Sequence, residues 1–348
     1  MLAEFFPQRK LELVGHPPLR LGFAPVKVRL ITTIPVFNGE AFLEQTLASV
    51  AQQTLKPDRV IVLDNCSTDR TEEIVRHFTA LKCEFIRNER NLGLFGNLNR
   101  CLDYAAQTDF LHLLHADDTI EAEFYQVMTE LFAAGDGRGL VWALDGRIDE
   151  HDQHLSVSGK ADGVVESLDR DTFLQRKAEL GNQAFCATLL RTAGQASPVK
   201  FVEDAPIMGD TLFWAAFGAQ CEKIIHVRRA LGNYRWHGGN QTNFLGPSIQ
   251  SLILDEWRTM ETNEALRGKG WSFFRKLKLK GLLAVRSGIK AKRVRQNGNP
   301  AYSREIVRAA RGITGWPLWL AGKFLVELRD FYLFKIRRQP RHPKNIYG

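Results

Sequence analysis

The chain has 348 residues, of which 44% are hydrophobic and 25% are charged. This composition is typical of soluble globular proteins, and the length can hold one large domain or two smaller ones. Its five cysteines are scattered and form no C-x-x-C pair, which argues against a disulfide framework or a zinc site and favours a reducing cytosol. No stretch reaches the roughly 18 apolar residues of a transmembrane helix, and the first 20 residues do not resemble a signal peptide.

The net charge of +8 is unevenly distributed. Residues 271–348 contain 19 Lys and Arg but 3 Asp and Glu, so the rest of the chain is acidic overall. A basic tail on an acidic body predicts an anionic partner for the tail, either a membrane or a nucleic acid.

The first hundred residues after a proline-containing leader, 1–26, alternate between strands and helices. β-Branched residues at 28–34 predict a strand, and apolar residues at helical spacing within 40–53 predict a helix. A second buried strand is expected at 60–63. Ser67, Thr68 and Asp69 are candidate N-caps of the next helix.

A third strand is expected at 84–86, and a turn at 91–96 leads into another helix. The apolar run that follows, 109–118, ends in two adjacent carboxylates, Asp117 and Asp118. Such a pair at the end of a central strand predicts a divalent cation, Mg²⁺ or Mn²⁺, because the two charges repel each other. The alternative is a solvated Asp-Asp turn before a helix over 121–132.

This order of elements predicts an α/β fold whose mostly parallel open sheet has helices on both faces. Polar clusters follow three of the strands, at 35–38, 64–69 and 115–118, and such strand ends line one crevice. Neither a G-x-G-x-x-G fingerprint nor a phosphate-binding G-x-x-x-x-G-K-[ST] loop is present. A metal is therefore the expected means of neutralising a bound diphosphate.

An ordered set of motifs resembles glycosyltransferase family 2. The set consists of 32–39, 46–54, 62–69, Asn91–Gly93 with Asn97 and Asn99, the Asp117–Asp118 pair, 209–214 and 234–237. The resemblance covers residues 28–243. It implies the Rossmann-like GT-A fold and an inverting, metal-assisted transfer of a sugar from a nucleotide donor.

The resemblance also implies the domains. Residues 27–245 would form the GT-A domain, with a nucleotide-sugar half at 27–140 and an acceptor half at 141–245. Residues 246–348 would form a basic, amphipathic helical region.

Carried over residue by residue, the family's pattern assigns a donor site. Its members would be Pro35, Phe37 and Asn38 near the base and ribose, Asp64 and Asn65 at the base, Asp117 at the ribose, and Asp118 as metal ligand. The family more often has Asp-Asp where this chain has Asp64 and Asn65. Because an amide donates as well as accepts, the choice between uracil and thymine stays open.

Asp210 matches the family's general base, which takes the proton of the acceptor hydroxyl. The alternative for Asp210 is an N-cap of a helix over 211–219, and the rival bases are Glu203 and Asp204. His237 corresponds to a histidine that reaches the metal or the diphosphate, or else it is an ordinary loop residue.

Other polar residues are expected to have structural roles or to lie in a loop. His112 and His115 are expected to be structural, because neighbouring residues of the strand point alternately into the core. The polar stretch 146–162 could suggest a metal site, but we expect a solvated loop that contributes to acceptor binding.

The tail interleaves basic and aromatic residues. Trp316, Leu320, Phe324, Leu328 and Phe331 recur at intervals of three or four, which places them on one face of a helix. This pattern is typical of a helix in the headgroup plane of a membrane, so an anionic membrane surface is the partner expected for 271–338. The alternative is a helical subdomain that packs on the catalytic body. Nucleic acid is not expected, because no recognition motif accompanies the charge.

The sequence thus predicts a metal-dependent glycosyltransferase that uses a UDP- or dTDP-sugar and a saccharide or lipid-linked saccharide acceptor. It would work in cell-surface polysaccharide or glycolipid assembly, at the inner face of the cytoplasmic membrane. The alternatives are a nucleotidyltransferase-like enzyme and a non-catalytic membrane scaffold with the same fold.

Overall fold

The computed structural model describes residues 28–180, 184–203, 208–238, 249–296 and 298–330. The expected leader, 1–26, lies outside this part of the chain. The contacts divide the chain into two compact units: unit 1 comprises 1–173, 182–204 and 213–240, and unit 2 comprises 174–181, 205–212 and 241–348.

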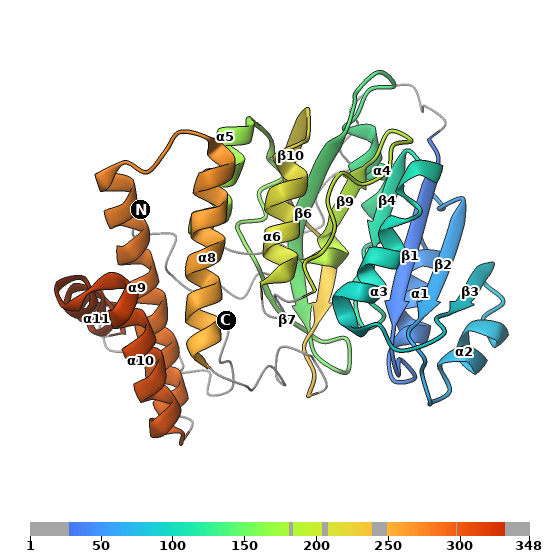
Figure 1. Ribbon diagram of the computed structural model, residues 1–348. Coiled ribbons are helices and arrows are strands. Elements are labelled where there is room, and N and C mark those ends of the chain that lie inside the picture. Colours follow the sequence, from blue (N-terminus) through green and yellow to red (C-terminus); the bar gives the residue numbers. More distant parts are fainter. Residues whose placement is uncertain (1–27, 181–183, 204–207, 239–248, 297, 331–348) are drawn as a thin grey trace. The chain divides into compact units, whose positions relative to one another are not determined.

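Unit 1 is built on one ten-stranded sheet, with the order β3-β2-β1-β4-β9-β6-β10-β5 and with β7 beside β6 and β8 beside β10 (Figure 1). The strands are β1 (Leu30–Val36), β2 (Arg59–Asp64), β3 (Cys83–Arg87), β4 (Phe110–Leu113), β5 (Thr119–Ile120), β6 (Gly139–Ile148), β7 (His154–Val157), β8 (Val165–Leu168), β9 (Thr188–Arg191) and β10 (Lys223–Arg235).

The first four strands in chain order pair in parallel, β1 with both β2 and β4, and β2 with β3. β9 then runs antiparallel to β4 and β6, while β10 returns parallel to β6. The predicted parallel sheet therefore occupies the first half of the unit, and the second half is mixed. Together they form one mixed sheet, which agrees with the predicted α/β fold.

Helices cover both faces of the sheet, and consecutive residues of β1 and β4, which point to opposite faces, are accordingly all buried. The helices of this part are α1 (Leu43–Ala51), α2 (Thr71–His77), α3 (Gly93–Leu102) and α4 (Phe124–Glu130). Two further helices, α5 (Arg170–Leu180) and α6 (Gly209–Gly218), are each divided between the two units. Leu43 and Leu47 of α1 and Phe124 of α4 join Leu30 and Ile34 of β1 in one core.

The expected solvated loop at 146–162 is wrong in part. β6 continues to Ile148 and pairs antiparallel with β7, so the segment forms a hairpin whose turn lies at 149–153. The hairpin buries Gly146 and Ile148 although its sequence is polar. Strand pairing satisfies the backbone groups here, and the charged side chains remain at the surface.

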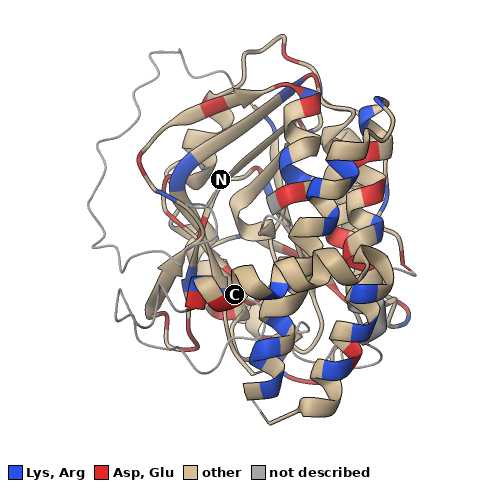
Figure 2. Ribbon diagram, turned by 90° about the vertical axis from the view of Figure 1, so that its left-hand side faces the viewer, with Lys and Arg blue, Asp and Glu red and all other residues tan. Residues whose placement is uncertain are grey.

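The described residues of the C-terminal part of unit 2 form four helices, α8 (Ile249–Arg267), α9 (Phe273–Gln296), α10 (Pro300–Thr314) and α11 (Trp316–Asp330). Their shared core includes Trp257, Leu283, Ile306 and Trp319. Lys and Arg recur along these helices (Figure 2). In the described part of the chain, no helix combines the length and hydropathy needed to cross a bilayer.

Candidate functional site

The predicted carboxylate pair lies in the loop between β4 and β5, and the neighbouring α1 holds this loop in place. The hydroxyl of Thr46 lies 2.9 Å from the carbonyl oxygen of Ala116 and 2.8 Å from that of Asp118. β4 pairs with β1 along its length, so the loop emerges at the carboxyl edge of the parallel strands. Asp117 and Asp118 therefore lie at the edge where the sequence predicted a ligand crevice.

Asp118 is almost completely buried. Its Oδ1 accepts a hydrogen bond of 2.9 Å from the backbone N–H of Arg235, whereas its Oδ2 is buried and accepts none from the described residues. Burial raises the pKa of Asp118 well above its ordinary value, and the neighbouring Asp117 raises it further. A buried carboxylate oxygen with no hydrogen-bond donor fits a position meant for a cation.

Asp117 is stabilised in its charged form. His237 Nε2 lies 3.1 Å from Asp117 Oδ2. Burial alone would raise the pKa of Asp117, but the His237 hydrogen bond and the charges of His115 and His237 outweigh it, so the pKa is lowered. The two adjacent carboxyls thus have pKa values displaced in opposite directions.

Ligand atoms of His115, Asp117 and Asp118 all lie within 4.8 Å of one another. These oxygen and nitrogen donors fit a divalent cation such as Mg²⁺ or Mn²⁺. His115 is predicted to be structural, and its ring does stack on Phe185 with centroids 4.4 Å apart, but the residue also belongs to this donor cluster. His237 reaches the same cluster through Asp117, and its predicted contact with the metal stays a prediction.

Arg235, at the end of β10, is a residue of the site that sequence reasoning missed. Its side chain is completely buried and donates to the carbonyl oxygens of Asp117 (2.8 Å) and Asp149 (3.0 Å). It also donates to the carboxylate of Asp152 at 2.7 Å, and the guanidinium lies 4.8 Å from the ring centroid of Phe42. Its strand also contains Arg228 and Arg229, so no local signal in the sequence distinguished Arg235 from them.

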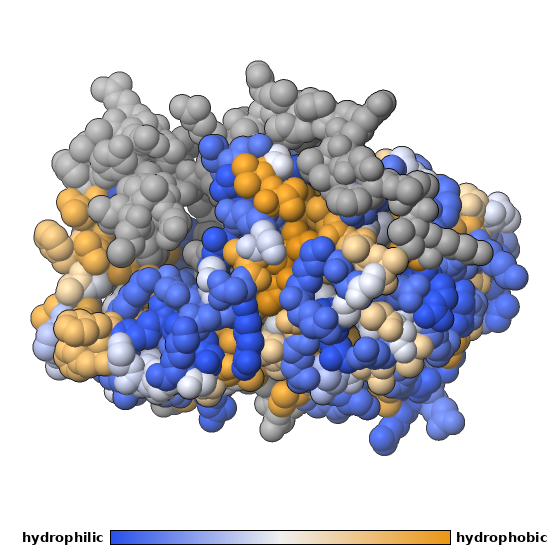
Figure 3. All heavy atoms as spheres, turned by 90° about the horizontal axis from the view of Figure 1, so that it is seen from above, coloured by the Kyte–Doolittle hydropathy of each residue, from blue (hydrophilic) through white to orange (hydrophobic). Residues whose placement is uncertain are grey.

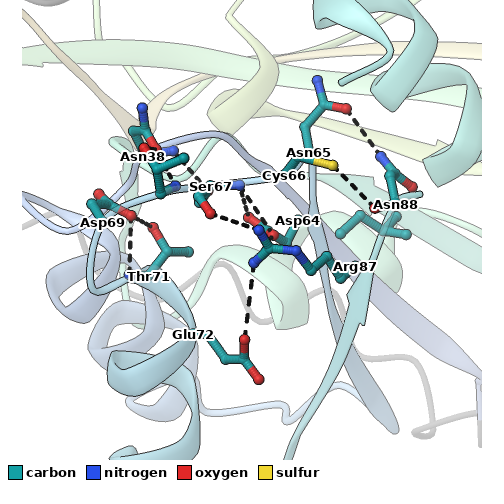
Figure 4. Close-up of polar contacts among 12 residues, drawn as sticks. Asn38, Asp64, Asn65, Cys66, Ser67, Asp69, Thr71, Glu72, Arg87 and Asn88 are labelled. Carbon is teal, nitrogen blue, oxygen red and sulfur yellow. Dashed lines mark hydrogen bonds and ion pairs between the residues drawn. The ribbon is translucent and has the colours of Figure 1, made fainter. Parts of the chain in front are cut away.

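The loop after β1 is joined to the loop after β2 by hydrogen bonds (Figure 4). Asn38 has a left-handed backbone, with φ of 53°. Its side-chain oxygen accepts from the N–H of Thr68 (2.8 Å), and its own N–H donates to the hydroxyl of Ser67 (2.8 Å). Pro35 is buried in β1 opposite Leu63. These contacts fix the position of the two loops relative to each other.

Asp64 is buried at the end of β2, where it accepts hydrogen bonds from the N–H of Ser67. Arg87 of β3 lies 3.2 Å from its carboxylate and is itself nearly half exposed. Arg87 also donates to the carbonyl oxygen of Ser67 at 2.8 Å. Asp64 is thus held by its own loop and by one cation at the edge of the crevice (Figure 4).

Asn65 is engaged in an amide network that the sequence did not reveal. Its oxygen accepts from the N–H of Leu92 (2.8 Å) and from the amide of Asn88 (3.1 Å), while its amide donates to Asn91 (2.9 Å). Asn88 donates to Asn97 in turn. The side chain of Asn65 therefore already fixes the 88–93 turn. The exposed ring of Phe37, by contrast, is available at this edge.

Asp210 belongs to unit 2. It is the second residue of α6 rather than the cap preceding it, and its carboxylate lies 2.6 Å from the N–H of Thr211. Burial lowers the pKa of the nearby Lys177 to about 7, while the Asp210 carboxylate acts in the opposite direction. Of the rival bases, Glu203 is exposed and Asp204 lies outside the described residues. The role of Asp210 stays a prediction.

Comparisons with known proteins agree with this architecture. Residues 32–189 match the family model for glycosyl transferase family 2. A putative glycosyltransferase of Bacillus subtilis, EpsH, is 28% identical over 109 residues, which are 31% of this chain and 31% of EpsH. The poly(ribitol-phosphate) beta-N-acetylglucosaminyltransferase TarS of Staphylococcus aureus is 30% identical over 93 residues, 26% of this chain and 16% of TarS. The chain thus matches less than two thirds of the length of these relatives.

Solved structures show the same fold over more of the chain. The crystal structure of S. aureus TarS residues 1–349 with UDP superposes with a TM-score of 0.58 at 15% identity, covering 90% of this chain and 93% of that one. The corresponding complex with UDP-GlcNAc gives a TM-score of 0.53. The motifs, the GT-A fold and the family match agree, and residues 32–189 form a glycosyltransferase family 2 domain.

Proposed function

We propose that the chain is an inverting, metal-dependent glycosyltransferase. It would transfer a sugar from a UDP- or dTDP-sugar to a saccharide or a lipid-linked saccharide, in the assembly of cell-surface polysaccharide or glycolipid. The observation that carries this proposal is the Asp117–Asp118 pair at the carboxyl edge of a GT-A sheet, with one buried oxygen left unsatisfied by the described residues. TarS, which has this fold, has been solved with UDP and with UDP-GlcNAc.

The donor would lie along the edge formed by the loops after β1, β2 and β4. Pro35, Phe37, Asn38 and Asp64 would contact the base and ribose. Asn65 would contribute mainly by fixing the 88–93 turn, because its amide and its oxygen already have partners within the chain.

Asp118, Asp117 and His115 would hold the metal, with His237 beside Asp117. A bound Mg²⁺ or Mn²⁺ would supply positive charge for the leaving diphosphate. The chain itself prepares the site, since the N–H of Arg235 fixes the orientation of Asp118 and the guanidinium of Arg235 fixes the carbonyl group of Asp117.

Asp210 would act as the general base that takes the proton of the acceptor hydroxyl. Lys177 is buried near it in the same unit. A lysine with a lowered pKa carries less positive charge near neutral pH than an ordinary lysine does. It therefore lowers the affinity of the Asp210 carboxylate for a proton less than a fully charged lysine would.

A thermal-shift titration tests the donor and metal site. UDP, dTDP, GDP and CMP would each be added with and without Mn²⁺, because a ligand of the folded state raises the melting temperature. We expect a metal-dependent shift for UDP or dTDP that is lost in Asp118→Asn. The control is Asp103→Asn, which removes an exposed carboxylate. A metal-dependent shift that persists in Asp118→Asn would exclude this metal site, and no shift in folded wild type would favour the scaffold alternative.

A second experiment tests the base. Asp210→Asn is expected to keep the nucleotide shift and lose glycosyl transfer, while Glu203→Gln keeps both. Transfer retained by Asp210→Asn would move the base to Glu203 or Asp204. Pyrophosphate release from a nucleoside triphosphate and a sugar phosphate would instead reveal a nucleotidyltransferase.

We also propose an anionic membrane surface as partner of the C-terminal region 271–338, which would place the enzyme at the inner face of the cytoplasmic membrane. The basic composition of this region and the exposure of Phe273, Phe274 and Phe324 support this partner.

A further inference from the structure

A groove rich in arginine lies within unit 2. It has a volume of about 860 Å³ and is formed by the end of α9, one face of α10 and the first residue of α11. Four arginines line it: Arg295, Arg304, Arg308 and Arg311. No carboxylate is among the described lining residues.

The fold fixes the face of α10 that lines the groove. Arg304, Arg308 and Arg311 are spaced by four and three residues, so they share one side of the helix. Ile306 and Ala310 lie on the other side and are buried in the core of the unit. The side-chain oxygen of Asn299 accepts a hydrogen bond from the backbone N–H of Tyr302 and caps the start of α10. The groove is therefore a fixed feature of the helix packing.

The four groove arginines differ from several other cations of the same helices, which form ion pairs. Lys290 and Lys292 of α9 lie 2.9 and 2.8 Å from the carboxylates of Glu256 and Glu327, respectively. Arg275 pairs with Glu264 at 2.8 Å. Within the described parts of the chain, the groove arginines form no such ion pair. The paired cations link neighbouring helices, whereas the positive charges of the groove arginines are not neutralised by a carboxylate of the described residues.

Arg311 lines the groove beside Trp316. Its guanidinium lies 3.4 Å from the ring centroid of Trp316, and its buried Nε has no hydrogen-bond partner among the described residues. A buried, unsatisfied donor beside several like charges is costly, and an anionic oxygen would satisfy it. The planar guanidinium matches the oxygens of a phosphate group, with which it forms paired hydrogen bonds.

Trp316 also begins an apolar stripe along α11. Trp316, Leu320, Phe324 and Leu328 follow at intervals of four, and each side chain is more than half exposed. The opposite side of α11 is buried, and Gly322 lies so close to α9 that an added Cβ would be 2.8 Å from the Cβ of Ala284. Apolar side chains also reach the surface at the left-hand edge of Figure 3, over the helices of this unit. The predicted stripe therefore faces outward from Trp316 to Leu328, and its last member, Phe331, lies outside the described residues.

We propose that the groove binds the phosphate headgroup of an anionic phospholipid while the α11 stripe enters the apolar boundary of the bilayer. This inference rests on the proposed membrane association and names its binding site and its ligand chemistry. The groove and the stripe meet at Trp316, so one lipid can place its phosphate among the arginines and its acyl chains along α11. An indole at this junction suits the headgroup level of a membrane.

Vesicle flotation of the full chain tests this proposal. The vesicles would contain phosphatidylcholine with or without phosphatidylglycerol. The double variant Arg304→Gln/Arg308→Gln changes two exposed side chains, and Arg70→Gln/Arg76→Gln removes the same charge from exposed sites of unit 1. We expect the groove variant to bind phosphatidylglycerol vesicles roughly tenfold or more weakly, and the control to bind like wild type.

The stripe is tested separately by Phe324→Ser, which is expected to weaken binding while leaving its salt dependence unchanged. Equal vesicle binding by the groove variant and wild type, or no binding of wild type to any vesicle, would overturn the proposal. So would a groove variant that loses binding to a duplex oligonucleotide but keeps binding to vesicles.

The nucleotide shift with Mn²⁺ is measured on the same variants without vesicles. It is expected to match wild type in all of them. Lost vesicle binding with a retained nucleotide shift therefore separates a failure of the lipid site from a failure of the glycosyltransferase assignment.

Discussion

Arg235→Met tests the interpretation that one buried guanidinium organises the metal site. Methionine resembles arginine in length and is apolar, so it fills much of the same space without donating hydrogen bonds. The variant leaves the carbonyl groups of Asp117 and Asp149 without their donor, at sites where the wild-type distances are 2.8 and 3.0 Å. The carboxylate of Asp152 also loses its partner.

The expected loss follows from these contacts. Each buried carbonyl left unsatisfied costs about 1–3 kcal/mol. The Asp152 carboxylate is more than half exposed, so its lost ion pair adds about 0–1 kcal/mol, because water replaces the guanidinium. The contact with Phe42 contributes about 1 kcal/mol or less. Relief from burying the guanidinium charge offsets part of the sum, and we expect a net loss of about 3–5 kcal/mol.

Urea unfolding of the metal-free protein measures this loss, with the midpoints compared at equal denaturant dependence. Arg70→Met is the matched control, because Arg70 is exposed and its pair with Glu40 spans 3.4 Å; we expect it to change stability by about 0.5 kcal/mol or less. Mn²⁺ affinity should fall only in Arg235→Met. A loss below about 1 kcal/mol, with unchanged Mn²⁺ affinity, would refute the role of Arg235.

Three further predictions concern the same unit. The raised pKa of Asp118 means that the folded, metal-free chain holds a proton that the unfolded chain releases. Stability should therefore fall as pH rises through the raised pKa, and Asp118→Asn should remove this fall from a plot of melting temperature against pH. Burial lowers the pKa of His112 from 6.5 to about 3. Because only the unfolded chain then protonates this histidine between pH 8 and pH 5, the free energy of unfolding should fall by about 2 kcal/mol over that range, and His112→Gln should not show this fall. A Cβ at Gly232 would lie 2.6 Å from the backbone of Cys186, so Gly232→Ala should lose about 1–3 kcal/mol in a urea titration, whereas Gly281→Ala, which meets open space, should be neutral or stabilising.

Local patterns predicted the first half of the fold well. The strand expected at 60–63 is β2, Arg59–Asp64, and the helix expected over 40–53 contains α1, Leu43–Ala51. These elements are encoded by their own residues, since continuous apolar runs form the buried parallel strands and helical spacing forms their covers. The second half is set by pairing across the chain. β7 has only four residues and is largely exposed, so its pairing with β6 explains why it is a strand.

The site shows the same division. The Asp117–Asp118 pair follows a strand and could be found from the sequence, because a strand end fixes the edge on which its next residues lie. The contribution of Arg235 could not be found, because its partner Asp117 lies 118 positions earlier in the chain. The hydrogen bonds of Asn65 could not be predicted for the same reason, since its partners lie on the 88–93 turn and no local sequence pattern indicates an amide network.

The separation between the carboxylate pair and Arg235 also has a consequence for the nascent chain. The ribosome makes Asp117 and Asp118 well before β10, which pairs with β6 and carries the arginine. At a synthesis rate of about 5–20 residues per second, Arg235 is added roughly 6–24 seconds after the two aspartates. During synthesis the β1–β4 half can form its parallel strands, but its carboxylate loop stays without the Arg235 contacts. The metal site therefore matures only after the ribosome has passed residue 235, however early the strands around it have folded.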